Sequence, residues 1–533
     1  MTLRLREVPL ALDEDEKLLP LRIAEELSIR VEMLKDLRLV RRGIDARRKS
    51  RIIFVHTVEF TTEDEAEILA RCVGNPRLER VAEVVPELPL RITVKHCALV
   101  VGMGPAGLFA ALALARSGAM VTLIDRGGAV EERVPAVERF WRDGILDPEN
   151  NVQFGEGGAG TFSDGKLTTR LNHPLTSEVL QTLVDCGAPA EILVQAKPHI
   201  GTDRLRLVLI RLRRKLQALG VEIRYKTRLT DLVMHAGRVR AGLCSNGDEI
   251  PCQSLVLALG HSARDTYALL ASAGVSLEAK PFAVGLRVEH PRVLIDAIQY
   301  GIADHPRLPA ADYALTWNDP ESRRGIYSFC MCPGGEVVLS SSALGEVVVN
   351  GMSRLHRDTP YSNSALVVTV RPEDFPGKDP LAGIRFQRQW EEAAFRCGGS
   401  NYFAPAQNLM SFLGGKGALL PSSPRPGVRE ADLTTVLPDF VSQGLRLALP
   451  QFERKMRGFV TREATLFGVE TRTSSPLRIV RSDQGESVSH PGLYPVGEGA
   501  GYAGGIMSAA IDGLRSVRHI IEKSNNLKDQ ESL

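Results

Sequence analysis

Three apolar segments near residue 100 follow one another in the order strand, helix, strand. Residues 97–101 (CALVV) and 120–124 (MVTLI) are short apolar runs, typical of strands buried on both faces. Between them, residues 105–117 carry Leu108 and Leu112 at helical spacing, after a proline that suits a first helical turn. The pattern predicts two buried strands joined by a tight turn and a helix.

The same region, residues 100–126, contains almost no charge, as a membrane helix of roughly twenty apolar residues would. However, Gly102-Met103-Gly104-Pro105 falls early in the run and would interrupt such a helix. Residues 1–20 contain acids where a signal peptide needs an apolar run. We therefore expect no membrane span and no secretion signal, and a cytoplasmic protein.

Glycines in the predicted turn match the dinucleotide fingerprint. Gly102 permits the tight turn, Gly104 lets the backbone approach a pyrophosphate, and Gly107 lets helix and strand pack closely. The helix amino terminus then presents N–H groups to the phosphates. Asp125 lies 18 residues after Gly107, at the end of the second strand, where it can accept hydrogen bonds from ribose hydroxyls. Further cofactor contacts are predicted at Pro105, Ala106 and Arg126.

A segment near the carboxyl end favours a flavin. Residues 493–496 read as a strand that ends in Gly497-Glu498, and Gly504-Gly505 opens a helix. In two-part FAD enzymes a late strand ends in Gly-Asp, and the next helix points its positive amino terminus at the flavin ring. Glu498 stands where Asp is commoner. Predicted contacts here are Gly497, Glu498, Gly504, Gly505 and Ile506.

A third segment agrees with FAD. Residues 254–259 form an apolar strand that ends at Gly260, after a β meander that begins near residue 234. A second G-x-G-x-x-G fed by a strand does not occur in the sequence, so we expect no dedicated nicotinamide domain. NAD(P)H, if it reduces the flavin, would bind transiently in the substrate cleft.

Longer motifs make the chain resemble a family of uncharacterised bacterial FAD-dependent dehydrogenases, or NAD(P)/FAD-dependent oxidoreductases, with an FAD-dependent carboxy-terminal domain. The motifs are FGEGGAGTFSDGKL (154–167), KPHIGTD (197–203), GHSARD (260–265), PFAVGLRVEHP (281–291), YSFCMCPGG (327–335), GVETRTSSP (468–476) and GEGAGYAGGI (497–506). The resemblance covers most of the chain and implies bound FAD and a redox role. It implies no particular substrate.

Residues 155–165 are rich in glycine, and the stretch from Gly160 to Lys166 imitates a P-loop. Leu167 stands where a magnesium-binding Ser or Thr must follow the lysine, so we predict no ATP hydrolysis. Such glycine density suits backbone that passes close to a flat ligand or its phosphates. Predicted flavin contacts are Gly158, Thr161, Ser163, Asp164 and Lys166; the alternative is a loop that only caps the domain.

Two cysteines, Cys330 and Cys332, are candidates for redox chemistry, since residues i and i+2 of a strand face the same way. That spacing suits a mutual disulfide poorly, and a free cysteine is mostly a small buried hydrophobe, so packing is the favoured interpretation. The eight cysteines form no C-x-x-C pair, so we expect no metal site of that type.

Basic residues near these segments suggest a substrate pocket. Arg287, Arg472 and Arg478 could bind a carboxylate, phosphate or phenolate, and His290 could act as an acid or base. His261 follows Gly260 and could also lie near the cofactor. Structural ion pairs, or a hydrogen-bonded core histidine, are the alternatives for each residue.

The formal net charge of +2 neither favours nor excludes an acidic partner. Within the first 94 residues, which we expect to form a small α+β domain, residues 35–51 hold eight basic residues against two acids. Such a patch could contact RNA, but interleaved aromatics and a named RNA-binding signature are missing from the sequence. A solvated basic loop, or one packed on acidic parts of its neighbour, is favoured.

The chain is too long for one ordinary domain. We expect an α/β fold with a Rossmann-like FAD-binding domain in two parts, an inserted α+β substrate-side domain and the small amino-terminal domain. The predicted boundaries are 1–94 (amino-terminal domain), 95–280 (FAD, first part), 281–462 (insertion), 463–525 (FAD, second part) and 526–533 (polar tail). The Pro-rich stretch 84–90 marks the first boundary.

The predicted function is an FAD-dependent oxidoreductase that transfers hydride between flavin N5 and a small substrate, with anionic ones favoured. An alternative is a binding or scaffold protein stabilised by FAD, whose basic amino-terminal domain engages RNA or a protein partner. A third, an NAD-only dehydrogenase, would be excluded by release of FAD on heating.

Overall fold

Five parallel strands form the sheet predicted around residue 100, in the order β23-β11-β5-β6-β7. The computed structural model describes residues 2–82, 90–169 and 173–531. The strands are β5 (Cys97–Val101), β6 (Met120–Ile124), β7 (Glu222–Arg224), β11 (Ser254–Leu257) and β23 (Leu493–Pro495). Helix α3 (Pro105–Ser117) joins β5 to β6, so the predicted strand–helix–strand unit is confirmed.

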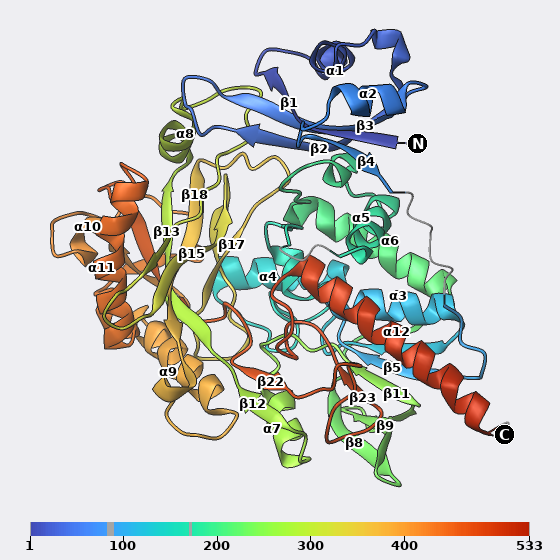
Figure 1. Cartoon of the computed structure of the whole chain (residues 1–533). Coiled ribbons are helices and arrows are strands. Elements are labelled where there is room, and N and C mark those ends of the chain that lie inside the picture. Colours follow the sequence, from blue (N-terminus) through green and yellow to red (C-terminus); the bar gives the residue numbers. More distant parts are fainter. Residues whose placement is uncertain (1, 83–89, 170–172, 532–533) are drawn as a thin grey trace.

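Both faces of this sheet are buried, because β5 alternates its side chains between two cores. Ala98 and Val100 pack with the helices on one face, whereas Leu99 and Val101 pack with a three-stranded meander on the other. The helices are α3, α5 (Leu175–Asp185), α6 (Thr202–Ala218) and α12 (Ile506–Glu531). The meander is β8 (Leu229–His235), β9 (Arg238–Cys244) and β10 (Glu249–Pro251). Helix α12 crosses this face beside α3 (Figure 1).

A second, seven-stranded sheet has the order β14-β15-β18-β13-β21-β19-β20. Its strands are β13 (Phe282–Pro291), β14 (Thr316–Asn318), β15 (Gly325–Cys332), β18 (Tyr361–Val370), β19 (Ala404–Asn408), β20 (Val428–Glu430) and β21 (Thr465–Glu470). The helices α8 (Arg292–Tyr300), α9 (Ala382–Cys397) and α11 (Asp439–Lys455) pack on it, at the left of Figure 1. The other elements used below or shown in Figure 1 are α4 (Val130–Asp143), α7 (Arg264–Ser272), α10 (Leu409–Phe412), β16 (Glu336–Leu339) and β17 (Val349–Met352).

The return to the FAD-type domain comes later than the predicted boundary at residue 463. Strand β21 pairs with β13, so residues 465–470 belong to the seven-stranded sheet. The chain leaves that sheet before β22 (Leu477–Ile479), which pairs with β12 (Leu277–Ala279) beside the parallel sheet. The predicted boundary was too early because pairing with β13, nearly 200 residues away, decides which sheet β21 joins, and local composition does not show this pairing.

The amino-terminal domain is a four-stranded antiparallel sheet with two helices on its core. Its elements are β1 (Thr2–Ala11), β2 (Lys35–Asp45), β3 (Ile53–Thr61), β4 (Leu78–Val81), α1 (Leu19–Leu27) and α2 (Glu65–Arg71). Most of the basic segment 35–51 is the edge strand β2 rather than the expected loop.

Two other predicted boundary regions, 84–90 and 526–533, include residues that the structure does not describe. The Pro-rich stretch 84–90 lies almost entirely outside the described residues. The predicted polar tail 526–533 is helical as far as Glu531, because α12 continues through it. Within the described residues, no helix combines the length and the apolar character that crossing a bilayer requires.

Candidate functional site

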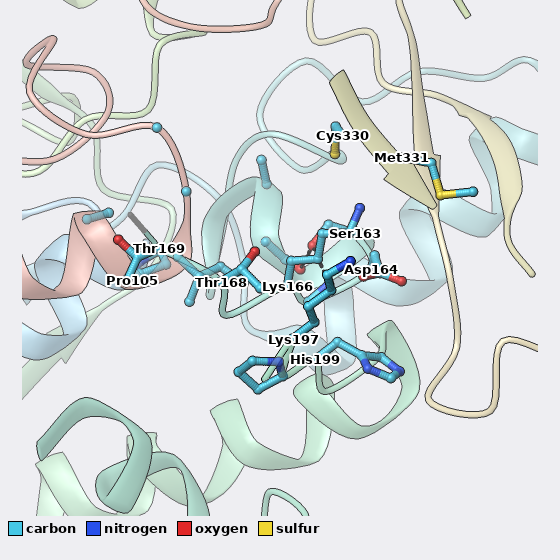
Figure 2. Close-up of a pocket in the computed structure, with 18 of the residues that line it drawn as sticks. Pro105, Ser163, Asp164, Lys166, Thr168, Thr169, Lys197, His199, Cys330 and Met331 are labelled. Carbon is cyan, nitrogen blue, oxygen red and sulfur yellow. Dashed lines mark hydrogen bonds between the residues drawn. The ribbon is translucent and has the colours of Figure 1, made fainter. Parts of the chain in front are cut away.

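A cavity of about 1930 Å³ lies at the carboxyl end of the parallel sheet. Its wall begins at Val101 and the following turn, continues through the loop at 153–169 and β15, and reaches the amino-terminal domain. Figure 2 shows part of this wall, from Pro105 and Thr169 to Cys330 and Met331. In open α/β sheets, ligands bind at this end of the strands.

Two glycines of the fingerprint are required by the protein's own packing. Gly102 has a left-handed φ of 105°, and a Cβ there would lie 2.4 Å from the Ala258 carbonyl oxygen. A Cβ at Gly107 would lie 1.9 Å from the Gly102 carbonyl oxygen, and Gly107 itself is buried behind the cavity wall. They hold the turn so that residues 102–106 line the cavity.

Four other glycines that line the cavity are required neither by their backbone conformation nor by packing against the protein. Gly104, Gly260, Gly504 and Gly505 all lack left-handed backbone, and a Cβ at any of them would meet no protein atom within 4 Å. They leave space on the side of α3 and on the side of α12 within one cavity. A long ligand that approaches the backbone at both helix amino termini fits this arrangement, as the predicted FAD would.

Asp125 ties the turn to the glycine-rich loop. Its Oδ2 accepts a hydrogen bond from Met103 N at 2.8 Å, and its Oδ1 accepts from Gly127 N and Gly155 N at 2.8 and 3.0 Å. Burial raises the pKa of Asp125, against the effect of these backbone donors. Three of about four acceptor positions are therefore filled, and the carboxylate lines the cavity with room for one more donor.

Arg126, the next residue, also lines the cavity and is held on three sides. Its guanidinium pairs with Glu149 at 2.7 Å and with Asp265 at 2.8 Å, and it lies 4.2 Å from the centre of the Phe154 ring. This fixed arginine forms the wall where the adenosine end of a dinucleotide would lie.

Arg133 of α4 organises the glycine-rich loop, although it is not among the residues predicted from the sequence. The side chain is fully buried. Its guanidinium donates to five acceptors, the carbonyl oxygens of Asn151, Val152, Glu156 and Gly158 and the Oγ1 of Thr161. Burial lowers the pKa of Arg133 to about 9, so it remains charged near neutrality. The available signal was an arginine on the apolar stripe of a helix, between Val130 and Val137.

The predicted contacts in this loop divide into two groups. Gly158, Ser163, Asp164 and Lys166 line the cavity. Thr161 does not, because it is fully buried between Arg133 and the Glu156 carbonyl. Asp164 forms an ion pair with Arg357 at 2.7 Å; burial alone would raise its pKa, but the guanidinium holds the pKa below its usual value.

At the carboxyl-terminal segment, Glu498 and residues 504–506 line the cavity. Gly497 does not, and its N–H donates to Asp512 Oδ2 at 2.8 Å. Burial raises the pKa of Glu498 to about 7, although Lys280 opposes the shift. His261 Nε2 lies 3.8 Å from the Glu498 carboxylate, and burial, with Arg472 nearby, lowers the pKa of His261 to about 3. His261 is therefore neutral at physiological pH.

The expected cationic pocket of Arg287, His290, Arg472 and Arg478 does not form. Arg287 is fully buried and pairs with Glu470 at 3.1 Å outside the cavity wall. His290 is buried against the Phe459 carbonyl at 2.8 Å, and burial lowers its pKa to about 4, so it is no acid or base for neutral pH. Arg478 pairs with Glu278. Only Arg472 lines the cavity, where Glu346 and Glu391 neutralise it.

The thiols of Cys330 and Cys332 contact each other, but only Cys330 lines the cavity. A bulge lies between Phe329 and Cys332, and Cys330 takes a left-handed φ of 44°, so the regular alternation is broken. Cys330 lines the cavity, whereas Cys332 is fully buried with its Sγ 3.4 Å from the Cys330 carbonyl oxygen.

The amino-terminal domain contributes to the wall, which the sequence did not reveal. Residues of β2 and β3, including Arg41 and Phe54, line the cavity. Strand β2 docks on the segment 194–196, with Arg42 N donating to Val194 O at 2.6 Å and Ala196 N to Arg42 O at 2.8 Å. That segment leads into residues 198–200, which bond to the loop at 165–167.

Comparison with known proteins places the chain in a family. Residues 281–473 match the family model described as "FAD-dependent protein, C-terminal domain-like", and residues 2–61 match a domain of unknown function (DUF8436). A Clostridium beijerinckii protein described as "Uncharacterized protein" is 44% identical over 530 residues, 98% of this chain and 99% of the relative. The chain belongs to this family of FAD-dependent proteins.

Several solved structures are weakly similar to the chain. An FAD complex of CtdE has a TM-score of 0.31 at 11% identity, covering 82% of this chain and 90% of that one. Glycine oxidase from Bacillus cereus has a TM-score of 0.32 at 10% identity, covering 81% and 98%. Glycerol-3-phosphate dehydrogenase from Bacillus halodurans, in complex with FAD, has a TM-score of 0.36 at 11% identity, covering 81% and 66%.

Proposed function

We propose that the protein is an FAD-dependent oxidoreductase whose cofactor and small-molecule substrate share the 1930 Å³ cavity. The observation that carries this proposal is the set of four glycines, Gly104, Gly260, Gly504 and Gly505, that keep space open along one wall without being needed by backbone or packing. Residues 102–106 would hold the pyrophosphate, Asp125 a ribose hydroxyl, and residues 504–506 the flavin ring.

The chain's own groups suit a redox site. When bound, FAD supplies two-electron chemistry at N5. The amino terminus of α12 presents its positive dipole to the cavity at Gly505 and Ile506, which favours negative charge there. The Glu498 carboxyl, with its pKa near 7, can hold or release a proton at the same wall, whereas His261 stays neutral there. The proposed reaction transfers hydride between flavin N5 and a small substrate, with anionic ones favoured. NAD(P)H is proposed as a reductant that binds transiently.

The first test is cofactor content. We expect protein purified without added cofactor, or reconstituted with FAD, to show flavin absorbance and to release intact FAD on heat denaturation. Anaerobic addition of NADH, NADPH or candidate substrates should then bleach that absorbance. Protein that takes up no FAD would refute the proposal. FAD that none of these reductants bleaches would support the binding or scaffold alternative instead.

A further inference from the structure

The cavity is larger than one cofactor needs. Sites for drug-sized ligands occupy about 300–1000 Å³, whereas this cavity measures about 1930 Å³. Beyond the residues that would hold FAD, it extends between the amino-terminal domain and the segment 299–313. We call this part the outer compartment; its wall includes Arg41, Phe54, Lys166, Lys197, Tyr300 and Arg307.

Contacts between the segments close the outer compartment into a ring. The Arg307 guanidinium lies 5.5 Å from the centre of the Phe54 ring, which joins the segment 299–313 to β3. Lys197 pairs with Asp312 at 2.5 Å. This ion pair joins the segment 299–313 to the loop at 194–197, which docks on β2. The amino-terminal domain is therefore one side of the compartment.

Most cations on this wall already have a carboxylate partner. These are Arg6 with Glu79, Arg42 with Glu16, Arg47 with Asp45, Lys197 with Asp312 and Arg357 with Asp164. Arg41, Lys166 and Arg307 form no ion pair within the described ranges. One carboxylate on this wall, Glu7, likewise has no ion pair among the described residues. The compartment thus keeps an excess of two positive charges.

We propose that the outer compartment binds the substrate by its anionic groups, and that the substrate is a small molecule with at least two carboxylates or phosphates. The proposal rests on the proposed function and names its substrate class. Arginine forks bind carboxylate and phosphate through two parallel hydrogen bonds, and lysine adds a point charge. Arg41, Lys166 and Arg307 come from three separate segments, so a ligand with two or more anionic groups would link the amino-terminal domain to the loop beside the flavin.

The experiment is calorimetric titration of FAD-loaded protein with pyrophosphate and, separately, with citrate. Loading with FAD blocks the cofactor's own phosphate site, and the two probes distinguish a phosphate from a carboxylate preference. We expect at least one probe to bind at low salt and to bind more weakly as salt rises. Arg41→Gln and Arg307→Gln should each weaken that binding about fivefold, with FAD content unchanged.

Arg48→Gln is the matched control, because Arg48 belongs to the same basic segment, is exposed and does not line the cavity. It should bind both probes like the wild type. Absence of binding, equal binding in all variants, or equal loss in Arg48→Gln would overturn the proposal. Binding of a short RNA but of neither small anion would also overturn it, in favour of a macromolecular partner. If the protein takes up no FAD, the proposed function fails separately, and the same titration of the apoprotein still tests the compartment.

Discussion

Glycines of the same short turn have opposite physical roles. Gly107 is needed because a Cβ would lie 1.9 Å from the Gly102 carbonyl oxygen. Gly104, three residues earlier, has an ordinary φ of −72° and open space where a Cβ would be. The fold therefore requires glycine at residue 107 but not at residue 104.

We predict that Gly104→Ala weakens FAD binding at least tenfold, because the methyl group occupies space that the pyrophosphate needs. The apoprotein should lose at most about 1 kcal/mol, since alanine is a poorer helix N-cap than glycine. Gly107→Ala should instead destabilise the apoprotein by about 1–3 kcal/mol through overpacking. Flavin titration and denaturant unfolding measure the two effects. A Gly104→Ala protein that binds FAD like the wild type would contradict the assignment of this space.

A second prediction concerns Glu498, whose pKa burial raises from 4.5 to about 7. Because the folded-state pKa lies above the unfolded value, the folded state binds the proton more tightly. The stability from this group is fully present below pH 4.5 and is lost as pH rises through 7. Glu498→Gln keeps the neutral form, so at pH 8 its free energy of unfolding should gain on the wild type by roughly 1–3 kcal/mol relative to pH 5. Equal pH profiles of apoprotein unfolding for the two proteins would refute this.

At the scale of an element, α4 acts as the support of the glycine-rich loop through Arg133. The loop bends sharply, with left-handed backbone at Gly155, Gly157 and Gly158. Four of its carbonyl oxygens turn toward the buried guanidinium, and a Cβ at Gly155 would lie 2.4 Å from Arg133 Cδ. The loop conformation therefore depends on one side chain of a neighbouring helix.

Arg133→Met should cost about 3 kcal/mol or more, because several buried carbonyl groups lose their donor together. It should also lower FAD content, since the loop lines the cavity. Arg139→Met is the control, as Arg139 is an exposed residue of the same helix. Denaturant unfolding and flavin absorbance report the two effects. Similar behaviour of the two variants would show that Arg133 does not organise the loop.

At the scale of the whole molecule, three sheets meet at one cavity, and the amino-terminal sheet joins it through backbone hydrogen bonds. Strand β2, at the edge of its own sheet, forms two backbone hydrogen bonds with residues 194 and 196 through Arg42. The amino-terminal domain is thereby coupled to the loop that carries Lys166.

We predict that Ala196→Pro, which removes the N–H that donates to Arg42 O, loosens this docking. Hydrogen exchange followed by mass spectrometry should show faster uptake in peptides covering residues 38–45 and 190–200. Peptides from α12 serve as the internal control, because that helix packs on α3 far from the docking strand in the sequence. Unchanged exchange at residues 38–45 would show that β2 is not held by this contact.

Local pattern determined the strand–helix–strand unit and its turn, because apolar periodicity and glycine spacing act between residues close in the sequence. The FAD-type fold was predicted from that unit together with two later segments and the family motifs. Long-range pairing decided the rest. β21 belongs to the seven-stranded sheet because it pairs with β13. Arg287 and His290 lie outside the cavity wall, where they contact Glu470 and the Phe459 carbonyl oxygen. These partners lie more than 150 residues away, so no local spacing predicts them. Only tertiary structure could place the basic strand β2 on the cavity wall, since that depends on which surfaces of two domains meet.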